Sequence, residues 1–267
     1  MTLPPLTSEQ FLLVQQVLNL TVALMGGAAL IFALLRGQLH RAYRPAMIVM
    51  SAAVGMASYH YLRLLAAWGA AYTQEGAVYR ATGAPFSDAY RYADWLGTVP
   101  LILSASLLVL DIGTVKSNRL MVRLAAAAVL MIALGYPGEI ESGNMTVRAL
   151  WGLASTVPFL YILYVLWREL ASVLRFETPR VQGLFSRLRQ LLLVSWSLHP
   201  LVFAFPLLGL AGPATLVVGQ VGHSIADISA KVLYGFLIYA IAREKTLHNE
   251  AMEEERRLLE GRAPTPA

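Results

Sequence analysis

The chain alternates between long apolar runs and short polar links. A run of roughly 20 apolar residues can cross the hydrocarbon core of a bilayer as a helix. Seven such runs predict seven membrane-spanning helices, with bounds Ser8 to Leu35, Ala46 to Tyr72, Ser87 to Ile112, Asn118 to Tyr136, Thr146 to Leu170, Leu184 to Leu210 and Pro213 to Ile241. Because the links are short, successive helices should pack as neighbours. The predicted fold is an all-α membrane protein, a seven-transmembrane-helix bundle.

The two longest links run from Gln74 to Phe86 and from Phe176 to Gly183. In the first, Val78-Tyr79-Arg80 and a Gly-Ala-Pro turn at 83–85 predict a short hairpin. After the last apolar run the sequence becomes polar and highly charged. We therefore divide the chain into a seven-helix domain, residues 1–247, and a cytoplasmic polar tail, residues 248–267, where a solvated helix end is followed by disorder.

Basic residues gather on one side of this arrangement, and they predict its orientation. If the N-terminus is outside, the inner links and helix ends carry most of them: Arg36, Arg41, Arg44, Lys116, Arg119, Arg123, Arg168, Arg175, Arg180, Arg187, Arg189, Arg243 and Lys245. The outer side keeps only a few, such as Arg80 and Arg148. We expect the N-terminus outside and the C-terminus in the cytoplasm.

Composition agrees with a multi-pass protein of the cell membrane. Of 267 residues, 57% are hydrophobic and 14% are charged, and the mean hydropathy is +0.57. The formal charge of +5 comes from residues at the ends of apolar runs, so it indicates topology in a lipid bilayer and no nucleic-acid partner. The absence of cysteine excludes disulfides, thiolate catalysis and cysteine-based zinc sites, and we expect no metal site.

Lys231 lies inside the last apolar run, where an ammonium group is costly and therefore indicates a functional site. Asp227 precedes it by four residues and shares its helical face. Lysine forms Schiff bases with carbonyl compounds, and a nearby carboxylate can stabilise the protonated adduct. A retinal-type aldehyde is the candidate ligand.

The third run holds a second charged group, in which Arg91, Asp94 and Thr98 project toward one side of a helix. A carboxylate at bilayer depth stays charged when it faces a protonated Schiff base and an arginine. Asp94 and Asp227 would then form a paired counterion to Lys231, with Arg91 balancing the excess negative charge. The alternative is that Arg91 and Asp94 are only a structural ion pair.

These motifs resemble those of a known family. Arg-Tyr-Ala-Asp-Trp-Leu at 91–96, followed by Thr98-Val99-Pro100, and Asp-x-Ser-Ala-Lys at 227–231 are similar to the third and seventh helices of a microbial (type 1) rhodopsin of the proteorhodopsin and bacteriorhodopsin kind. The resemblance covers nearly the whole seven-helix region. It implies all-trans retinal bound as a Schiff base to Lys231, in a pocket formed by Tyr92, Trp95, Met131, Gly135, Phe159, Trp196, His199, Pro200 and Phe203.

Two histidines carry further expectations. His60 resembles a histidine of the proteorhodopsin branch that hydrogen-bonds the proton-accepting aspartate, which would couple Asp94 to the pH through the imidazole; the alternative is a packing residue. His199 stands where the family usually has a tyrosine bonded to the seventh-helix aspartate. It could pair with Asp227 or simply replace one donor by another, and the sequence leaves both possibilities open.

The resemblance implies a light-driven outward proton pump, not an enzyme, with Asp94 as proton acceptor. Many pumps of the family carry a carboxylic donor seven residues after the threonine, where this chain has Ala105. Reprotonation must then use water from the cytoplasm, so we expect a slow photocycle. The alternative is a photosensory rhodopsin that signals to a transducer partner. We expect protons as the substrate and assembly as a homo-oligomer.

Overall fold

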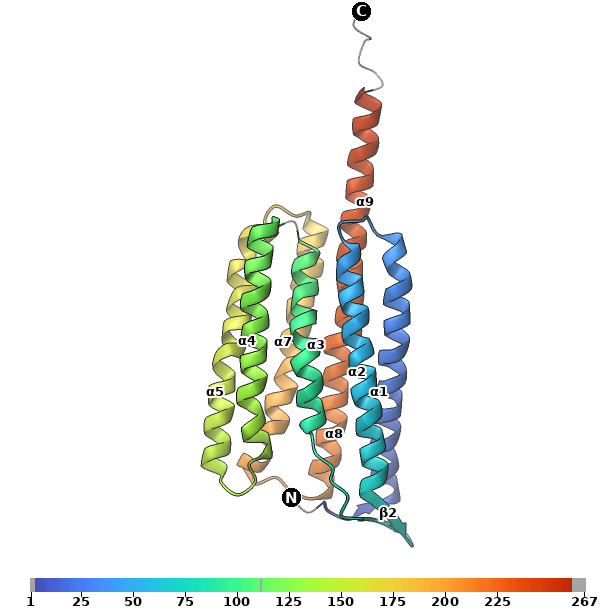
Figure 1. The fold of residues 1–267 in the computed structure, drawn as a ribbon, viewed down its shortest axis with the longest axis vertical. Helices are drawn as coiled ribbons and strands as arrows, with labels where there is room; N and C mark the ends of the chain where they lie inside the picture. Colours follow the sequence, from blue (N-terminus) through green and yellow to red (C-terminus); the bar gives the residue numbers. More distant parts are fainter. Residues whose placement is uncertain (1–2, 111, 261–267) are drawn as a thin grey trace, which may run out of the picture.

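The computed structural model describes residues 3–110 and 112–260, and these form a bundle of long helices standing side by side (Figure 1). The helices are α1 Ser8–Leu35, α2 Arg44–Ala71, α3 Ala89–Leu108, α4 Thr114–Ile140, α5 Met145–Tyr164, α6 Ala171–Leu174, α7 Pro179–Phe203, α8 Pro213–Ile228 and α9 Tyr234–Glu260. The π-helical turns η2 Val165–Glu169 and η4 Ser229–Leu233 join α5 to α6 and α8 to α9. Short 3-10 turns, η1 Arg36–Gln38 and η3 Pro206–Leu208, follow α1 and α7. The predicted all-α seven-helix fold is confirmed, with α5 to α6 and α8 to α9 each making one rod.

The sixth rod, α7, is shifted toward the N-terminus relative to the prediction. It was expected from Leu184 to Leu210 but runs from Pro179 to Phe203. Its start is set by polar chemistry: the Thr178 side chain accepts a hydrogen bond from the Val181 amide, and proline occupies the first turn. An apolar run cannot mark such a start, because the first turns of this helix extend beyond the apolar segment.

The last helix continues through most of the predicted polar tail (Figure 1). The expectation of disorder was wrong for residues 248–260, which are helical; residues 261–267 lie outside the described part of the chain. Contacts from the link between α1 and α2 hold the helix there. The His40 amide donates to Thr246 at 2.9 Å, and Asn249 donates to the Tyr43 hydroxyl at 3.3 Å.

A small antiparallel sheet covers one end of the bundle, in the order β1 Leu6–Thr7, β3 Val78–Ala81, β2 Tyr72–Glu75. We call this the hairpin end, and the opposite end, from which α9 leaves, the tail end. The predicted hairpin is present, but its turn lies at Gly76, whose φ of 63° suits glycine, and not at 83–85. Phe11 stacks on Tyr79, with ring centroids 3.9 Å apart, and fixes the hairpin to α1.

Many large apolar side chains face outward, while the charged side chains at the bundle centre are buried. Leu34 is 78% exposed and Leu30 70%, while Asp94 and Lys231 are each only 1% exposed. Within the described residues, four rods are long and apolar enough to cross a membrane: Ser8–Gln38, Thr114–Ile140, Met145–Leu174 and Pro213–Leu259. An apolar surface around a charged interior is the arrangement that a lipid environment favours.

Candidate functional site

Lys231 lies at the centre of the bundle, in the π-helical turn η4. Its Nζ donates to Asp94 Oδ2 at 2.8 Å and to Asp227 Oδ1 at 2.5 Å. All three side chains are almost completely buried. The structure therefore brings together, from α3, α8 and η4, the lysine and the two carboxylates that the sequence singled out. A buried ammonium between two carboxylates is compensated in charge and in hydrogen bonding.

Arg91 lies on the hairpin side of this group and does not contact Lys231. Its guanidinium donates to Asp88 at 3.0 Å, to the Tyr61 hydroxyl at 2.5 Å and to Gln220 at 2.7 Å, and it lies 3.9 Å from Asp227. The predicted role in balancing charge thus includes a third carboxylate, Asp88. Sequence reasoning missed Asp88, although its position three residues before Arg91 on one helical face could have revealed it.

The two carboxylates beside Lys231 have different surroundings. Asp227 accepts hydrogen bonds from the Tyr61 hydroxyl at 2.7 Å and from Trp95 Nε1 at 3.1 Å. Asp94 Oδ1, in contrast, is buried and has no hydrogen-bond partner among the described residues. Thr98 shares the face of Asp94, but its hydroxyl donates to the Asp94 main-chain carbonyl at 3.0 Å and not to the carboxylate. Asp94 therefore has one oxygen free to receive a proton.

The expected hydrogen bond between His60 and Asp94 is not present in the described part of the chain. His60 is half-buried on α2, with its ring edge against Tyr59 at a centroid distance of 5.4 Å. It is close enough to Asp94 to interact electrostatically. Its proposed functional role therefore stays a prediction.

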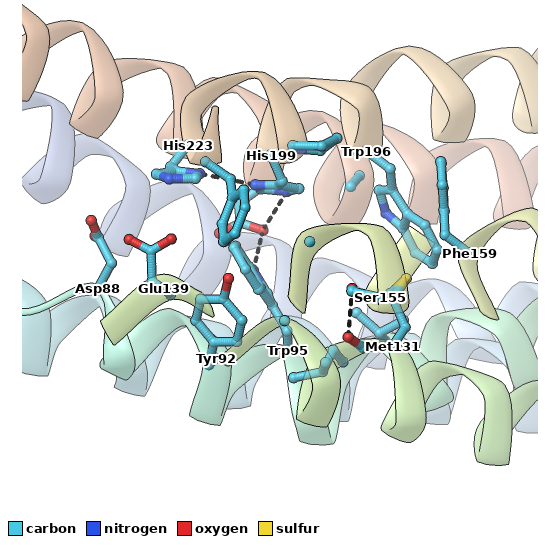
Figure 2. A pocket seen from close by; sticks show the side chains of 18 of the residues that line it. Asp88, Tyr92, Trp95, Met131, Glu139, Ser155, Phe159, Trp196, His199 and His223 are labelled. Carbon is cyan, nitrogen blue, oxygen red and sulfur yellow. Dashed lines mark hydrogen bonds and ion pairs between the residues drawn. The ribbon is translucent and has the colours of Figure 1, made fainter. Parts of the chain in front are cut away.

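A cavity of about 250 Å³ extends from Lys231 between α3, α4, α5 and α7. All nine residues assigned to the pocket line it: Tyr92, Trp95, Met131, Gly135, Phe159, Trp196, His199, Pro200 and Phe203 (Figure 2). Apolar residues that the sequence did not single out complete the wall: Val99, Ile102, Ile132 and Ala230. Rigid aromatic walls and a few polar groups suit an elongated apolar ligand.

His199 makes a contact that the sequence did not suggest. Its Nε2 lies 3.8 Å from Asp227, too far for a hydrogen bond, while its Nδ1 lies 3.0 Å from Nδ1 of His223. Two more carboxylates, Asp88 and Glu139, line the same end of the cavity (Figure 2). Glu139 pairs with Arg148 at 3.1 Å. The hairpin side of the cavity is therefore rich in titratable groups.

On the tail side of Lys231 the interior is mainly apolar. Ala105 is fully buried, together with Leu103 and Leu107 of α3. The Ser106 hydroxyl and the Tyr234 hydroxyl form a short hydrogen bond there. Among the described residues, no carboxyl group stands at the position where a proton donor was sought.

Known proteins share both the fold and the sequence pattern. The model of the family described as bacteriorhodopsin-like protein matches residues 12–245. A crystal structure of thermophilic rhodopsin has a TM-score of 0.90 and 42% identity, covering 92% of this chain and 99% of that one. The structure of xanthorhodopsin, a light-driven ion pump with dual chromophore, has a TM-score of 0.89 and 41% identity, covering 93% and 99%. A green-light absorbing proteorhodopsin from Gamma-proteobacterium EBAC31A08 is 25% identical over 226 residues, 83% of each chain.

Proposed function

This chain belongs to the bacteriorhodopsin-like family, and we propose that it is a light-driven pump that moves protons outward, with Asp94 as the proton acceptor. Its family makes it a microbial rhodopsin, a multi-pass protein of the plasma membrane. One observation carries the proposal: the Lys231 nitrogen lies within hydrogen-bond distance of two buried carboxylates, of which only Asp94 keeps an oxygen without a partner.

The residues present fit retinal. The cavity leads to Lys231, and Gly135 leaves room in its wall, since a Cβ there would lie 3.3 Å from both Tyr92 and Ser155. Trp95 and Trp196 supply the flat apolar surfaces that a polyene needs. When bound to Lys231, retinal supplies light absorption and an isomerisation that changes the direction and proton affinity of the lysine nitrogen.

The protein's own groups would decide where the proton goes. Asp227 is fixed as an anion by the donors Tyr61 and Trp95, so it stabilises positive charge on Lys231 without taking the proton. Asp94 faces the same nitrogen with a free oxygen, so it is the group that can accept. Arg91, joined to Asp88, Tyr61 and Gln220, adds the positive charge that keeps this buried group of carboxylates compensated.

The outward direction rests on orientation in the membrane. Most basic residues outside the buried site lie on the links and helix ends of the tail end, which favours the cytoplasm for that end. The hairpin end, with Asp88, Glu139 and the two histidines, then faces outside. A proton accepted at Asp94 would leave through this polar half, and Lys231 would be reprotonated through the apolar half past Ala105. The missing carboxyl makes that second step slow.

Illuminated cells that express the protein, supplied with all-trans retinal, test the proposal. We expect the medium to become more acidic in the light, and an uncoupler to abolish the change. Cells with the Lys231→Ala variant are the matched control and should give no signal. Light-induced alkalinisation, or no uncoupler-sensitive change at all in the wild type, would contradict an outward pump.

A photosensor is the second candidate function, favoured by one observation. Helix α9 continues as a polar rod to Glu260, well beyond the other helices (Figure 1). Its charged surface could bind a transducer. Absence of proton transport in the cell experiment, with a normal visible absorption band, would favour this candidate.

A further inference from the structure

The contact between His199 and His223 has no role in the function proposed so far. The two imidazoles lie nearly parallel, with ring centroids 5.2 Å apart and planes inclined by 19°. Their Nδ1 atoms are 3.0 Å apart. At that distance one Nδ1 carries a proton and donates it to the other. The pair is therefore joined by a single shared proton.

This pair lies between two groups of carboxylates. Nε2 of His199 faces Asp227 at 3.8 Å, next to Lys231. On the other side, His223 lies near enough to Asp88 to interact with its charge, and Asp88 in turn interacts with Glu139. The side chains of Asp88 and Glu139 are each 22% exposed, in contrast to 2% for Asp227. A line of titratable groups thus runs from the buried centre to the partly exposed hairpin end (Figure 2).

We propose that His199 and His223 form a proton relay that carries the pumped proton from the counterion group around Asp227 to Asp88 and Glu139 at the hairpin end. This inference rests on the proposed function. The two histidines would be further residues of the transport path, because each holds the moving proton itself.

The transfer is balanced in protons. The proton that Asp94 has accepted moves to Nε2 of His199, attracted by the anionic Asp227 beside that ring, and the shared proton moves from Nδ1 of His199 to Nδ1 of His223. The proton on Nε2 of His223 then leaves to a carboxylate of Asp88 or Glu139. One proton enters and one leaves, so no other reactant is needed. Both rings end as the opposite tautomer. Each regains its starting tautomer by giving the new proton to water and taking one from water on its other nitrogen, with no net change in protons.

The charges around the pair give the relay its timing. Lys231, Arg91 and Asp227 act on His199, and Arg91, Asp88 and Asp227 act on His223. While Lys231 is positive, two cations oppose a positive charge on the pair. Once Lys231 has given its proton to Asp94, Asp227 lacks that cation and attracts a proton to the nearby imidazole. Recharging of Lys231 then expels the proton toward the hairpin end.

Flash experiments on the full-length protein with retinal, in lipid nanodiscs with pyranine in the solution, test the relay. The time from the flash to proton release is compared with the formation of the blue-shifted absorbance, which reports proton loss from Lys231. His223→Asn keeps a hydrogen-bonding amide beside His199 but cannot relay a proton. We expect it to delay release about tenfold or more without slowing the blue shift, since positioned acid–base groups contribute factors of this size. His199→Gln should also lengthen the interval between the blue shift and proton release, and this interval in the double variant should be no longer than in either single one.

His248→Asn is the matched control, because His248 is exposed at the tail end, and it should release protons at the wild-type time. Nitrogen-15 NMR of histidine-labelled protein in the dark gives a readout independent of transport. One protonated and one bare Nδ1, coupled through a hydrogen bond that His223→Asn removes, is the expected result.

The outcomes separate the two proposals. A wild type that releases no proton overturns the pump and the relay together. A wild type that releases protons, with unchanged release times in both single variants, overturns the relay alone. So does an NMR spectrum in which the two Nδ1 atoms are not coupled.

Discussion

The two halves of the bundle on either side of Lys231 are built from different kinds of side chain. The hairpin half holds a buried network of charged and polar groups: Tyr61, Asp88, Arg91, Glu139, Arg148, His199, Gln220 and His223. The tail half, near the middle of α3, is packed with Ile102, Leu103, Ala105 and Leu107. Both halves lie inside the same helices, so the difference comes from sequence and not from architecture.

This difference teaches how one bundle can treat a proton differently in its two directions. Polar side chains that hydrogen-bond one another can hold a charge at successive positions, because each position already has hydrogen-bond partners that stabilise it. An apolar segment offers none, so a charge that enters it must bring water or a titratable group with it. The hairpin half is therefore expected to release protons readily, while the tail half delivers them slowly.

Removing the side chain of Lys231, which lies between the two halves, should have the largest effect. Lys231→Ala takes away the only described lysine inside the bundle centre that could bind retinal, so the visible absorption band should be lost completely. Absorption spectra after addition of all-trans retinal measure this. Lys116→Ala, which changes an exposed lysine, should keep the band. A covalent chromophore that borohydride still traps in Lys231→Ala would contradict the assignment.

Removing the proton acceptor should abolish transport while leaving the chromophore in place. Asp94→Asn keeps the size of the side chain but cannot accept the proton, so light-driven acidification should fall by about 100-fold or more. The band should already be red-shifted at neutral pH, because a counterion is lost. In the wild type, acid should produce the same red shift as Asp94 takes up a proton. An unshifted spectrum in Asp94→Asn would exclude it as the main counterion.

A carboxyl placed in the apolar half should make the two halves more alike. Ala105→Glu puts an acid on the face of Asp94, roughly 16 Å toward the tail end. In apolar surroundings it should stay protonated and act as a donor. Recovery of the dark state should become about tenfold faster or more, and should lose its slowing at high pH. Flash photolysis over a range of pH values measures both.

The neighbouring position provides the control for that variant. Ser104→Glu adds the same acid about 100° around the helix, away from the face of Asp94, and should leave the recovery slow. If Ala105→Glu recovers as slowly and with the same pH dependence as the wild type, the donor position is not where helical spacing places it.

The smallest expected effect concerns His60, at the edge of the polar half. His60→Asn should shift the midpoint of the acid-induced red shift, because a nearby imidazole that gains a proton alters the field at Asp94. Spectral titration of both proteins measures the shift. An identical midpoint in the variant would leave His60 with a packing role only.

The sequence predicted the bundle and the centre of the site well, because both depend on short-range patterns. Apolar runs gave α1 its exact bounds, from Ser8 to Leu35. Helical spacing placed Asp227 beside Lys231, and the residues that the motif resemblance assigned to the pocket line the cavity. Such features need only the period of a helix.

Features that depend on contacts between distant segments could not be predicted in this way. His199 and His223 are 24 residues apart on different helices, and their contact follows from how α7 packs on α8. The same holds for the bond between Gln220 and Arg91, across 129 residues. The strand Leu6–Thr7 was missed because two residues carry no alternation, and it forms only by pairing with Val78 and Tyr79.

The π-helical turn η4 has a consequence for the phase of the last rod. A π turn holds about one residue more than an α turn, so it rotates everything beyond it by about 100° relative to an uninterrupted helix. Lys231 stands inside this turn, between Asp227 of α8 and Tyr234 of α9, whose hydroxyl is bonded to Ser106. The extra residue lets Asp227 and Tyr234 each point in the direction that their contacts require. Deleting one residue from Ser229–Leu233 would rotate either Lys231 or the rest of α9 away from its present contacts, so helix register at this point couples the site around Lys231 to the tail end.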